Sequence, residues 1–236
     1  MTTGVKIARN GAGCHHWLVL SVAVLSAGLG LAFSRGALAW GTDDARMAAD
    51  IAELLAIEPG STVAEVGAGH GEMTARIAEK VGPTGHVYST EIDADRRADI
   101  RKRVAHDKLA NVSVVEATPT DTGLPVHCCD AIYMIGVYHH ITDPVATDRS
   151  LFGALKPGGR LLVNDFPPTL WLWPWTPAGV PADRGGHGVS DRIVTQELTQ
   201  AGFQQVRKIS PWHAGFLIRT NYALVFRKPP EPAAPR

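Results

Sequence analysis

The sequence predicts an α/β fold, in which a doubly wound, mostly parallel sheet carries helices on both faces. Two observations predict it. From residue 42 to residue 226, segments typical of strands alternate with segments typical of helices. In addition, the residues of chemical interest fall where successive strands end: Gly67, Glu91, Ala117, Tyr138 and Asp165. Ligands of such sheets bind outside the carboxyl ends of the strands, so the sequence predicts a site at that edge.

The first half of the domain is expected to contain three strands. A helix capped by Thr42 or Asp43 carries its apolar residues on one face, and Pro59-Gly60 ends it. The strands are short, apolar or β-branched, and bounded by turn residues. They are expected at Thr62–Val66, His86–Glu91 and Asn111–Glu116, with helices at Glu72–Val81 and from Asp93 onward.

The second half continues the alternation and then breaks it. Strands are expected at Asp130–Val137 and Arg160–Asp165, with a helix at Val145–Leu155 between them. The segment Phe166–Pro177 is rich in proline and tryptophan, which excludes a regular helix and is typical of a lid, a binding loop or a surface flap. Beyond it we expect a helix capped by Ser190 and ending at Ala201, and strands at Gln205–Ile209 and Phe216–Phe226.

Residues 1–39 differ in kind from the rest. Lys6 and Arg9 precede an apolar run from Trp17 to Phe33, and Ala37-Leu38-Ala39 follows. This pattern predicts a secretory signal peptide cleaved after Ala39, or an uncleaved membrane anchor, because the run of about 17 residues is near the lower limit for a spanning helix. Either reading predicts an exported domain, periplasmic or membrane-anchored and facing outward. A misassigned start codon would leave the protein cytoplasmic.

The remaining domain organisation is simple. We expect a domain at residues 42–228 and a disordered, proline-rich tail at residues 229–236. The formal net charge is +0, which does not favour nucleic acid as a partner, and the basic residues between 96 and 103 are interpreted as an exposed helix face. Cys128 and Cys129 are interpreted as small apolar residues ahead of a strand, or as exposed thiols. No cysteine or histidine spacing is typical of a metal site, so none is predicted.

The most informative motif follows the first strand. Glu65, Gly67, Gly69 and Gly71 form a Glu-x-Gly-x-Gly-x-Gly sequence, and Glu91 ends the next strand twenty residues later. Glycines allow a sharp turn and let a ligand approach backbone N–H groups. The acid is placed to accept hydrogen bonds from a ribose diol. The third glycine comes one residue earlier than in a dinucleotide-binding fingerprint.

This motif resembles the first motif of class I S-adenosylmethionine-dependent methyltransferases. Four further segments resemble the same family: the acid at Glu91, Val114–Ala117, the strand ending in Tyr138-His139-His140, and Leu155–Leu161. The last of these, with Ala201-Gly202-Phe203 and the closing strand, is similar to the small-molecule branch. The resemblance implies a Rossmann-like, seven-stranded sheet whose last strand is antiparallel, and S-adenosylmethionine as the cofactor.

The resemblance also implies residue roles. Glu65 and the three glycines would shape the pocket for the methionine end of the cofactor, and Glu91 would hold the ribose hydroxyls. Ile92 would pack on adenine, and Ala117 and Thr118 would lie beside it. Thr118 stands where many relatives have an acid, which is a departure from the family pattern. The residues expected beside the sulfonium are Val137 and Tyr138.

The sulfonium is already an activated methyl donor, so the protein mainly positions the acceptor and, where needed, removes its proton. Candidate catalytic residues are His139, His140, Asp165 and His187, each of which could instead be structural. The expected acceptor is a small or lipid-like molecule; membrane association through the N-terminus is possible, and the sequence does not indicate an oligomeric state. The fourth strand lacks the Asn/Asp-Pro-Pro-Tyr/Phe motif of enzymes that methylate nucleic-acid amines.

Two alternatives remain open. The Val87–Asp93 segment is also similar to enzymes that methylate isoaspartyl residues in proteins. The other alternative is a methyltransferase-like binding module without catalysis, since S-adenosylmethionine is made in the cytosol and does not cross membranes unaided.

Overall fold

The computed structural model describes residues 43–168, 175–213 and 221–231, which belong to a compact unit beginning at Asp43. The predicted leader lies outside these residues. Trp171 and Trp173 also lie outside them. The same holds for residues 216–220 of the strand predicted to begin at Phe216, and for residues 232–236 of the proline-rich tail.

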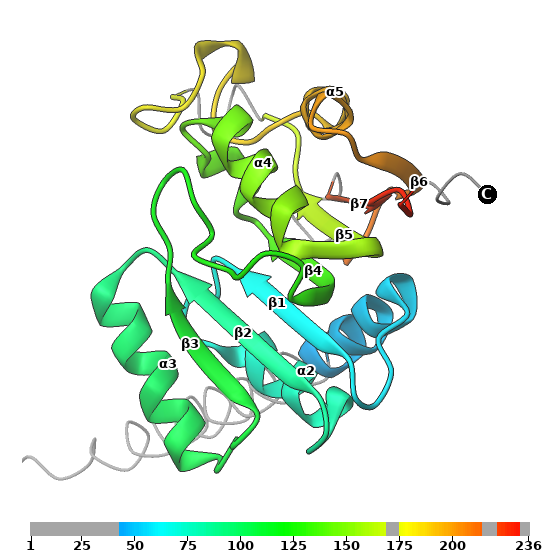
Figure 1. Cartoon of the computed structure of the whole chain (residues 1–236). Coiled ribbons are helices and arrows are strands. Elements are labelled where there is room, and N and C mark those ends of the chain that lie inside the picture. The colour runs from blue at the N-terminus through cyan, green and yellow to red at the C-terminus, as the bar shows by residue number, and fades with distance from the viewer. Residues whose placement is uncertain (1–42, 169–174, 214–220, 232–236) are drawn as a thin grey trace, which may run out of the picture. The chain divides into compact units, whose positions relative to one another are not determined.

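In the described part of the chain, seven strands form one sheet in the order β3-β2-β1-β4-β5-β7-β6 (Figure 1). β1 pairs in parallel with both β2 and β4, so the chain order reverses between β1 and β4. β7 runs antiparallel to β5 and to β6. The predicted fold class is therefore confirmed. The strands are β1 (Thr62–Val66), β2 (His86–Glu91), β3 (Val112–Glu116), β4 (Cys129–Ile135), β5 (Leu155–Asp165), β6 (Gln204–Ile209) and β7 (Tyr222–Arg227).

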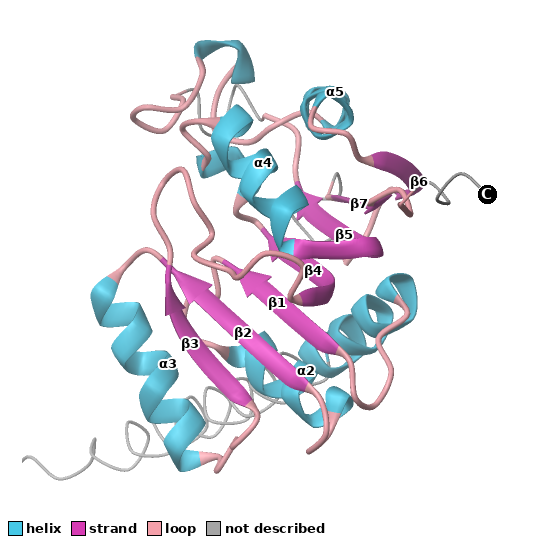
Figure 2. Cartoon of the chain, viewed as in Figure 1, coloured by secondary structure: helices cyan, strands magenta, loops and turns pink. Residues whose placement is uncertain are grey.

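Helices cover both faces of this sheet (Figure 2). Side chains alternate along each strand, so β4 sends Ile132 and Met134 into one core and Ala131 and Tyr133 into the other. The first core is closed by α4 and α5, and the second by the helix of residues 43–55 and by α2. The helices are α2 (Glu72–Val81), α3 (Ala94–His106), α4 (Pro144–Ala154) and α5 (Asp191–Gln200), with short 3-10 helices η1 (Tyr138–His140) and η2 (Ala182–Arg184).

The predicted capping residues are confirmed at two helices. The Asp93 side chain accepts a hydrogen bond from the Arg96 N–H, and the Ser190 side chain accepts one from the Ile193 N–H. Each satisfies a backbone donor that the first helical turn leaves without an intrahelical partner.

The boundaries of two neighbouring strands, β4 and β5, were wrong. β4 ends at Ile135, whereas the sequence predicted Val137. β5 begins at Leu155, whereas the sequence predicted Arg160 because Pro157, Gly158 and Gly159 are typical of a turn. The structure keeps these residues in the strand through a register shift, in which Cys129 pairs with Leu155 but Ala131 pairs with Arg160. The irregular pairing accommodates the proline and the glycines.

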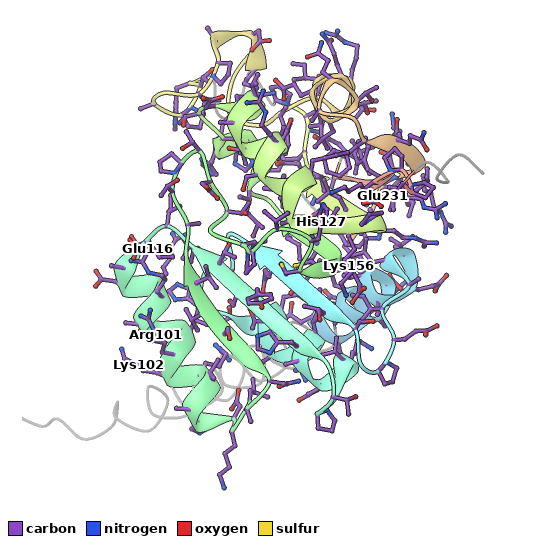
Figure 3. All side chains as sticks on the ribbon, in the orientation of Figure 1. Arg101, Lys102, Glu116, His127, Lys156 and Glu231 are labelled. Atoms are coloured by element: carbon purple, nitrogen blue, oxygen red, sulfur yellow. The ribbon has the colours of Figure 1, made fainter. Side chains whose placement is uncertain are left out.

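The charged and sulfur-containing residues fall largely as expected. Arg101 and Lys102 project outward from α3 (Figure 3). Arg97, by contrast, is buried and donates to the backbone oxygens of Glu91 and Ile92. Cys129 opens β4 and is buried, and Cys128 is half-buried; both are free thiols. Among the described helices, none combines the length and apolar character needed to cross a bilayer.

Candidate functional site

The turn after β1 carries the glycine motif and depends on backbone conformations that other residues rarely adopt. Gly67 and Gly69 have φ values of 75° and 58°. A Cβ atom on Gly67 would lie 2.6 Å from the Val137 Cγ2 atom, whereas a Cβ atom on Gly69 would meet nothing within 4 Å. Gly67 is therefore required for packing against the end of β4, and Gly69 faces open space. The turn ends at Gly71, which caps the N-terminus of α2.

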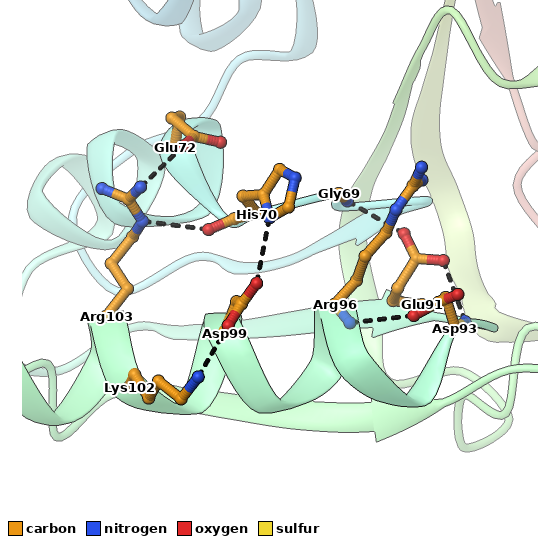
Figure 4. Close-up of polar contacts among 9 residues, drawn as sticks. All are labelled: Gly69, His70, Glu72, Glu91, Asp93, Arg96, Asp99, Lys102 and Arg103. Carbon is orange, nitrogen blue, oxygen red and sulfur yellow. Dashed lines mark hydrogen bonds and ion pairs between the residues drawn. The ribbon is translucent and has the colours of Figure 1, made fainter.

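The Glu91 carboxylate ties this turn to the end of β2. It is 4% exposed; one oxygen accepts a hydrogen bond from the Gly69 N–H at 2.9 Å, and the other accepts from the N–H groups of Ile92 and Asp93 (Figure 4). These bonds fix the carboxylate at the carboxyl edge of the sheet. The oxygen that accepts from Gly69 keeps a further lone pair, so the group can still accept a hydrogen bond from a ligand hydroxyl.

The residues predicted near an adenine ring lie at the same edge. The Ile92 side chain is 59% exposed, an unusual setting for a large apolar group next to a glycine-rich turn. Ala117 is buried, and its backbone N–H donates to the backbone carbonyl oxygen of Glu91. Thr118 is exposed, and its hydroxyl accepts a hydrogen bond from the Thr120 N–H, so it serves a local turn.

Glu65 lies beneath the glycine turn and is almost fully buried. It accepts a hydrogen bond from the Thr74 hydroxyl of α2, which also bonds to Ser89 of β2. Burial raises the pKa of Glu65 from 4.5 to about 7, and the bond from Thr74 opposes this shift. Through this hydrogen bond Glu65 links β1 to α2, and its carboxyl group is buried inside the domain rather than exposed to a ligand.

His139 and Asp165 form a buried pair at the ends of β4 and β5. The Nδ1 atom of His139 lies 2.9 Å from Asp165 Oδ1, and the His139 N–H donates to Asp165 Oδ2 at 3.0 Å. The Phe166 N–H also donates to this carboxylate. The side chains of His139 and Asp165 are 3% and 0% exposed. With Nδ1 donating to the carboxylate, Nε2 is the free, basic nitrogen of His139.

His140 and His187 complete an imidazole cluster with His139. The His139 ring centroid lies 4.0 Å from that of His140 and 4.8 Å from that of His187. Burial and the neighbouring imidazoles lower the pKa of both His140 and His187 below the usual value. The structure therefore brings together all four predicted catalytic residues: His139, His140, Asp165 and His187.

The loop that delivers His187 is held close to the end of β5. The Val189 N–H donates to the Phe166 oxygen at 2.9 Å. Gly188 has a φ of 123°, and a Cβ atom there would lie 2.9 Å from the same oxygen. Only glycine allows the backbone at position 188 to come this close to the Phe166 oxygen. The neighbouring residue, His187, is therefore held next to the His139–Asp165 pair.

Tyr138 does not join the other predicted cofactor residues. It is fully buried in the core, and its hydroxyl donates to Asp148 of α4 at 2.8 Å and to Glu197 of α5 at 3.0 Å. Its neighbour Val137 is half-buried and packs against Gly67, as expected for a residue at the edge. We therefore assign Tyr138 to packing between the sheet and its helices.

The buried network around Tyr138 could not be found from the sequence. Arg184 is 1% exposed, pairs with Glu197 at 3.0 Å and lies over the Tyr138 ring. Burial raises the pKa of Asp148 to about 7. In the sequence, Arg184 lies in a segment typical of a loop, and Glu197 lies on the polar surface of a predicted helix. Only the tertiary packing shows that the two residues form a pair.

A separate recess of about 500 Å³ lies on the outer side of the glycine turn. Charged side chains that line it pair with one another: Arg103 with Glu72 at 2.6 Å, and Lys102 with Asp99 at 2.9 Å (Figure 4). The predicted site residues are not among those lining it, and we do not assign it to the site.

Comparison with known proteins agrees with this geometry. Residues 64–161 match a family model described as a methyltransferase domain. A ubiquinone/menaquinone biosynthesis C-methyltransferase (UbiE) of Vibrio cholerae serotype O1 is 34% identical over 114 residues, which cover 46% of this chain and 42% of that protein. The chain thus spans less than half the length of the curated relatives it matches.

Solved structures share the fold. A S-adenosylmethionine-dependent methyltransferase from Aquifex aeolicus has a TM-score of 0.62 and 20% identity, covering 77% of this chain and 89% of its own. The [4+2]-cyclase SpnF has a TM-score of 0.63 and 18% identity, covering 79% and 82%. The architecture is therefore that of the class I methyltransferase fold.

We predict that Glu65 makes the stability of the protein depend on pH. Its folded-state pKa of about 7 lies above the ordinary 4.5, so its contribution is fully present below pH 4.5 and is lost as the pH rises to 7. The shift corresponds to about 3 kcal/mol. Urea unfolding at several pH values should show this decline in the wild type and not in Glu65→Gln. Glu79→Gln, an exposed change on α2, should follow the wild type; a Glu65→Gln curve parallel to the wild type would contradict the assignment.

We predict that Gly67→Ala destabilises the fold more than Gly69→Ala does. Both substitutions place a side chain at positive φ, at a cost of about 1–2 kcal/mol. Gly67→Ala adds close contacts of 2.6, 2.9 and 3.3 Å with the Cγ2, Cγ1 and Cβ atoms of Val137, which a rotamer change cannot fully relieve. Overpacking of this kind costs a further ~1–3 kcal/mol. Urea unfolding should rank the two variants, and Val137→Ala should rescue Gly67→Ala but not Gly69→Ala. Equal losses, or no rescue, would exclude the packing role.

Proposed function

We propose that this protein binds S-adenosylmethionine at the carboxyl edge of the sheet and transfers its methyl group to a small or lipid-like acceptor. The observation that carries this proposal is the position of Glu91, whose buried carboxylate is fixed by three backbone N–H groups beside a glycine turn. A carboxylate so placed can accept a hydrogen bond from a ribose hydroxyl. The match of residues 64–161 to a methyltransferase domain supports the same reading.

The edge offers a contact for each part of the cofactor. Ile92 presents an exposed apolar surface on which adenine can stack, and Gly69 leaves open space where the backbone can approach the methionine end. Val137 stands between the glycine turn and the histidine cluster. We therefore expect the methyl group near the ends of β1 and β4.

The chemistry is an in-line displacement. A nucleophilic atom of the acceptor attacks the methyl carbon, the carbon–sulfur bond breaks, and its electron pair stays on sulfur. Alignment of the two reactants supplies most of the rate enhancement, about 7–11 kcal/mol in well-oriented systems. Where the acceptor must lose a proton, the histidine cluster receives it.

The acceptor class rests on analogy. The Vibrio cholerae relative is named as a C-methyltransferase of ubiquinone/menaquinone biosynthesis, and a small, lipid-like acceptor fits that resemblance. Methylation of isoaspartyl protein and a binding role without catalysis are the alternatives. The retained Glu91 and glycine geometry favours a working cofactor site over the non-catalytic role, because a scaffold has no need of an exposed Ile92 beside a fixed carboxylate.

We further propose that residues 1–39 export the domain or anchor it to the membrane. The basic start, the apolar run and the small residues at Ala37–Ala39 support this. Fusing a reporter enzyme that is active only outside the cytoplasm to the C-terminal end should give activity with the intact chain. Deletion of residues 1–39 should abolish that activity while leaving the protein amount similar. Equal reporter activity without the segment would refute export.

We predict that Glu91→Ala weakens S-adenosylmethionine binding at least tenfold, because the ribose hydroxyls lose their carboxylate partner. Calorimetric titration of the full-length protein with S-adenosylmethionine and with S-adenosylhomocysteine measures this directly. Glu79→Ala removes an exposed carboxylate on α2 and should bind as the wild type does. Thermal unfolding without ligand separates any loss of folding from a loss of binding. Unchanged affinity in Glu91→Ala would refute the site, and no binding by the wild type at millimolar cofactor would favour the non-catalytic role.

A further inference from the structure

Three imidazoles meet at the edge of the sheet in an arrangement that the methyl-transfer chemistry does not require. One ring nitrogen each of His139, His140 and His187 lies within 4.8 Å of the others. His139 and His140 come from η1, and His187 comes from the loop held against Phe166. The sequence analysis predicted no metal site, because the third histidine lies far along the chain and the spacing matches no known ligand pattern.

We propose that His139, His140 and His187 bind a divalent transition-metal ion, for which Zn²⁺ is the best match, and that Asp165 orients His139 in this site. Imidazole nitrogen suits zinc, copper, iron and nickel, whereas magnesium and calcium prefer oxygen. Three protein ligands and one open position are typical of catalytic zinc sites.

The Asp165 carboxylate is the second, independent observation. It accepts a hydrogen bond from His139 Nδ1 at 2.9 Å, so the lone pair of His139 is on Nε2. Histidines that bind metals commonly donate their other N–H group to a carboxylate, which fixes the ring and increases its basicity as a ligand. Asp165 is itself held by the N–H groups of His139 and Phe166. The His139 ring is therefore already oriented to bind a metal ion through Nε2.

The distances require only a modest closure. Around a tetrahedral ion with Zn–N bonds of about 2.0–2.1 Å, ligand nitrogens lie roughly 3.3 Å apart. The observed spread reaches at most 4.8 Å. His139 is 3% exposed and fixed, whereas His140 is exposed and His187 is half-buried. Rotation of the two more accessible rings closes the difference while His139 stays in place.

The electrostatic setting also suits a cation. Asp165 adds a negative charge behind His139, and Arg96 of α3 is a cation acting on His140 from a distance. His139 is buried, His187 is half-buried and His140 is exposed. The open coordination position of the ion would therefore face the exposed side of the cluster, where an acceptor enters.

An ion in this position has a consequence for the proposed methyl transfer, and only this consequence rests on that proposed function. An acceptor hydroxyl bound at the open position would release its proton to solvent at a lower pH than it does in water, as zinc-bound water does. The site itself does not depend on which acceptor is methylated.

The test is zinc binding by the untagged, full-length protein after treatment with a chelator. Competition with a chromophoric zinc indicator should show one tight site per chain. His139→Ala, His140→Ala and His187→Ala should each weaken binding about 100-fold or more, whereas His106→Ala should not, since His106 is exposed on α3. Asp165→Asn, which keeps the shape and removes the charge, should weaken binding about 10–100-fold. The visible spectrum of Co²⁺ in the same site should change in each cluster variant.

Two further measurements make the outcome decisive. His140→Ala replaces an exposed side chain, so its thermal unfolding without metal should match the wild type and exclude misfolding. Calorimetry with S-adenosylmethionine in the metal-free protein tests the cofactor site separately, so either proposal can fail while the other stands. Zinc binding no tighter in the wild type than in the triple alanine variant, or an equal loss in His106→Ala, would overturn the metal site and leave a proton-transferring histidine cluster.

Discussion

The contact between Gly67 and Val137 is the constraint on which the rest of the site depends. It joins the turn after β1 to the turn after β4, at the place where the strand order reverses. An open parallel sheet forms its crevice at such a reversal, because the flanking connections leave in opposite directions. A side chain on Gly67 would push these turns apart and separate the two halves of the edge.

The two halves have different chemistry. On the side of β2 and β3, Glu91 is fixed by backbone N–H groups and Ile92 is exposed, which suits a ribose and a flat base. On the side of β4 and β5, the imidazole cluster and Asp165 suit a proton, an oxygen ligand or a metal ion. Each half uses a carboxylate that accepts several N–H bonds, so each charge is held in place before any ligand arrives.

The sequence predicted the fold well because the signals for this fold are local. Strand β1 and helix α2 begin and end where apolar runs and glycines indicated, and Asp93 and Ser190 act as the predicted caps. The start of β5 was missed because a register shift, which is a property of two paired strands, carries Pro157 and the glycines into the sheet. Local preference favoured a turn there, and pairing with β4 outweighed it.

The site was predictable in part for the same reason. Strand ends are visible in sequence, so Glu91, His139 and Asp165 could be placed at one edge, although their hydrogen bonds could not. The direction of Tyr138 was not visible, because neighbouring residues of a 3-10 helix point about 120° apart, and only the packing against α4 and α5 shows that Tyr138 faces those helices. The three-histidine cluster depends on a loop held by Gly188, a tertiary contact without a sequence signature.

The fold alone does not decide the reaction, since a [4+2]-cyclase shares this architecture with methyltransferases. Under the proposed function, the half of the edge on the side of β4 and β5 receives the acceptor. In this chain that half is built from imidazoles braced by one buried carboxylate, with the most accessible ring at the entrance. Substrates with an ionisable oxygen fit such a surface better than purely apolar ones, because neutral imidazole accepts a proton or shares a metal with that oxygen. Under the proposed function, we therefore expect an acceptor that presents an acidic hydroxyl to the end of β4.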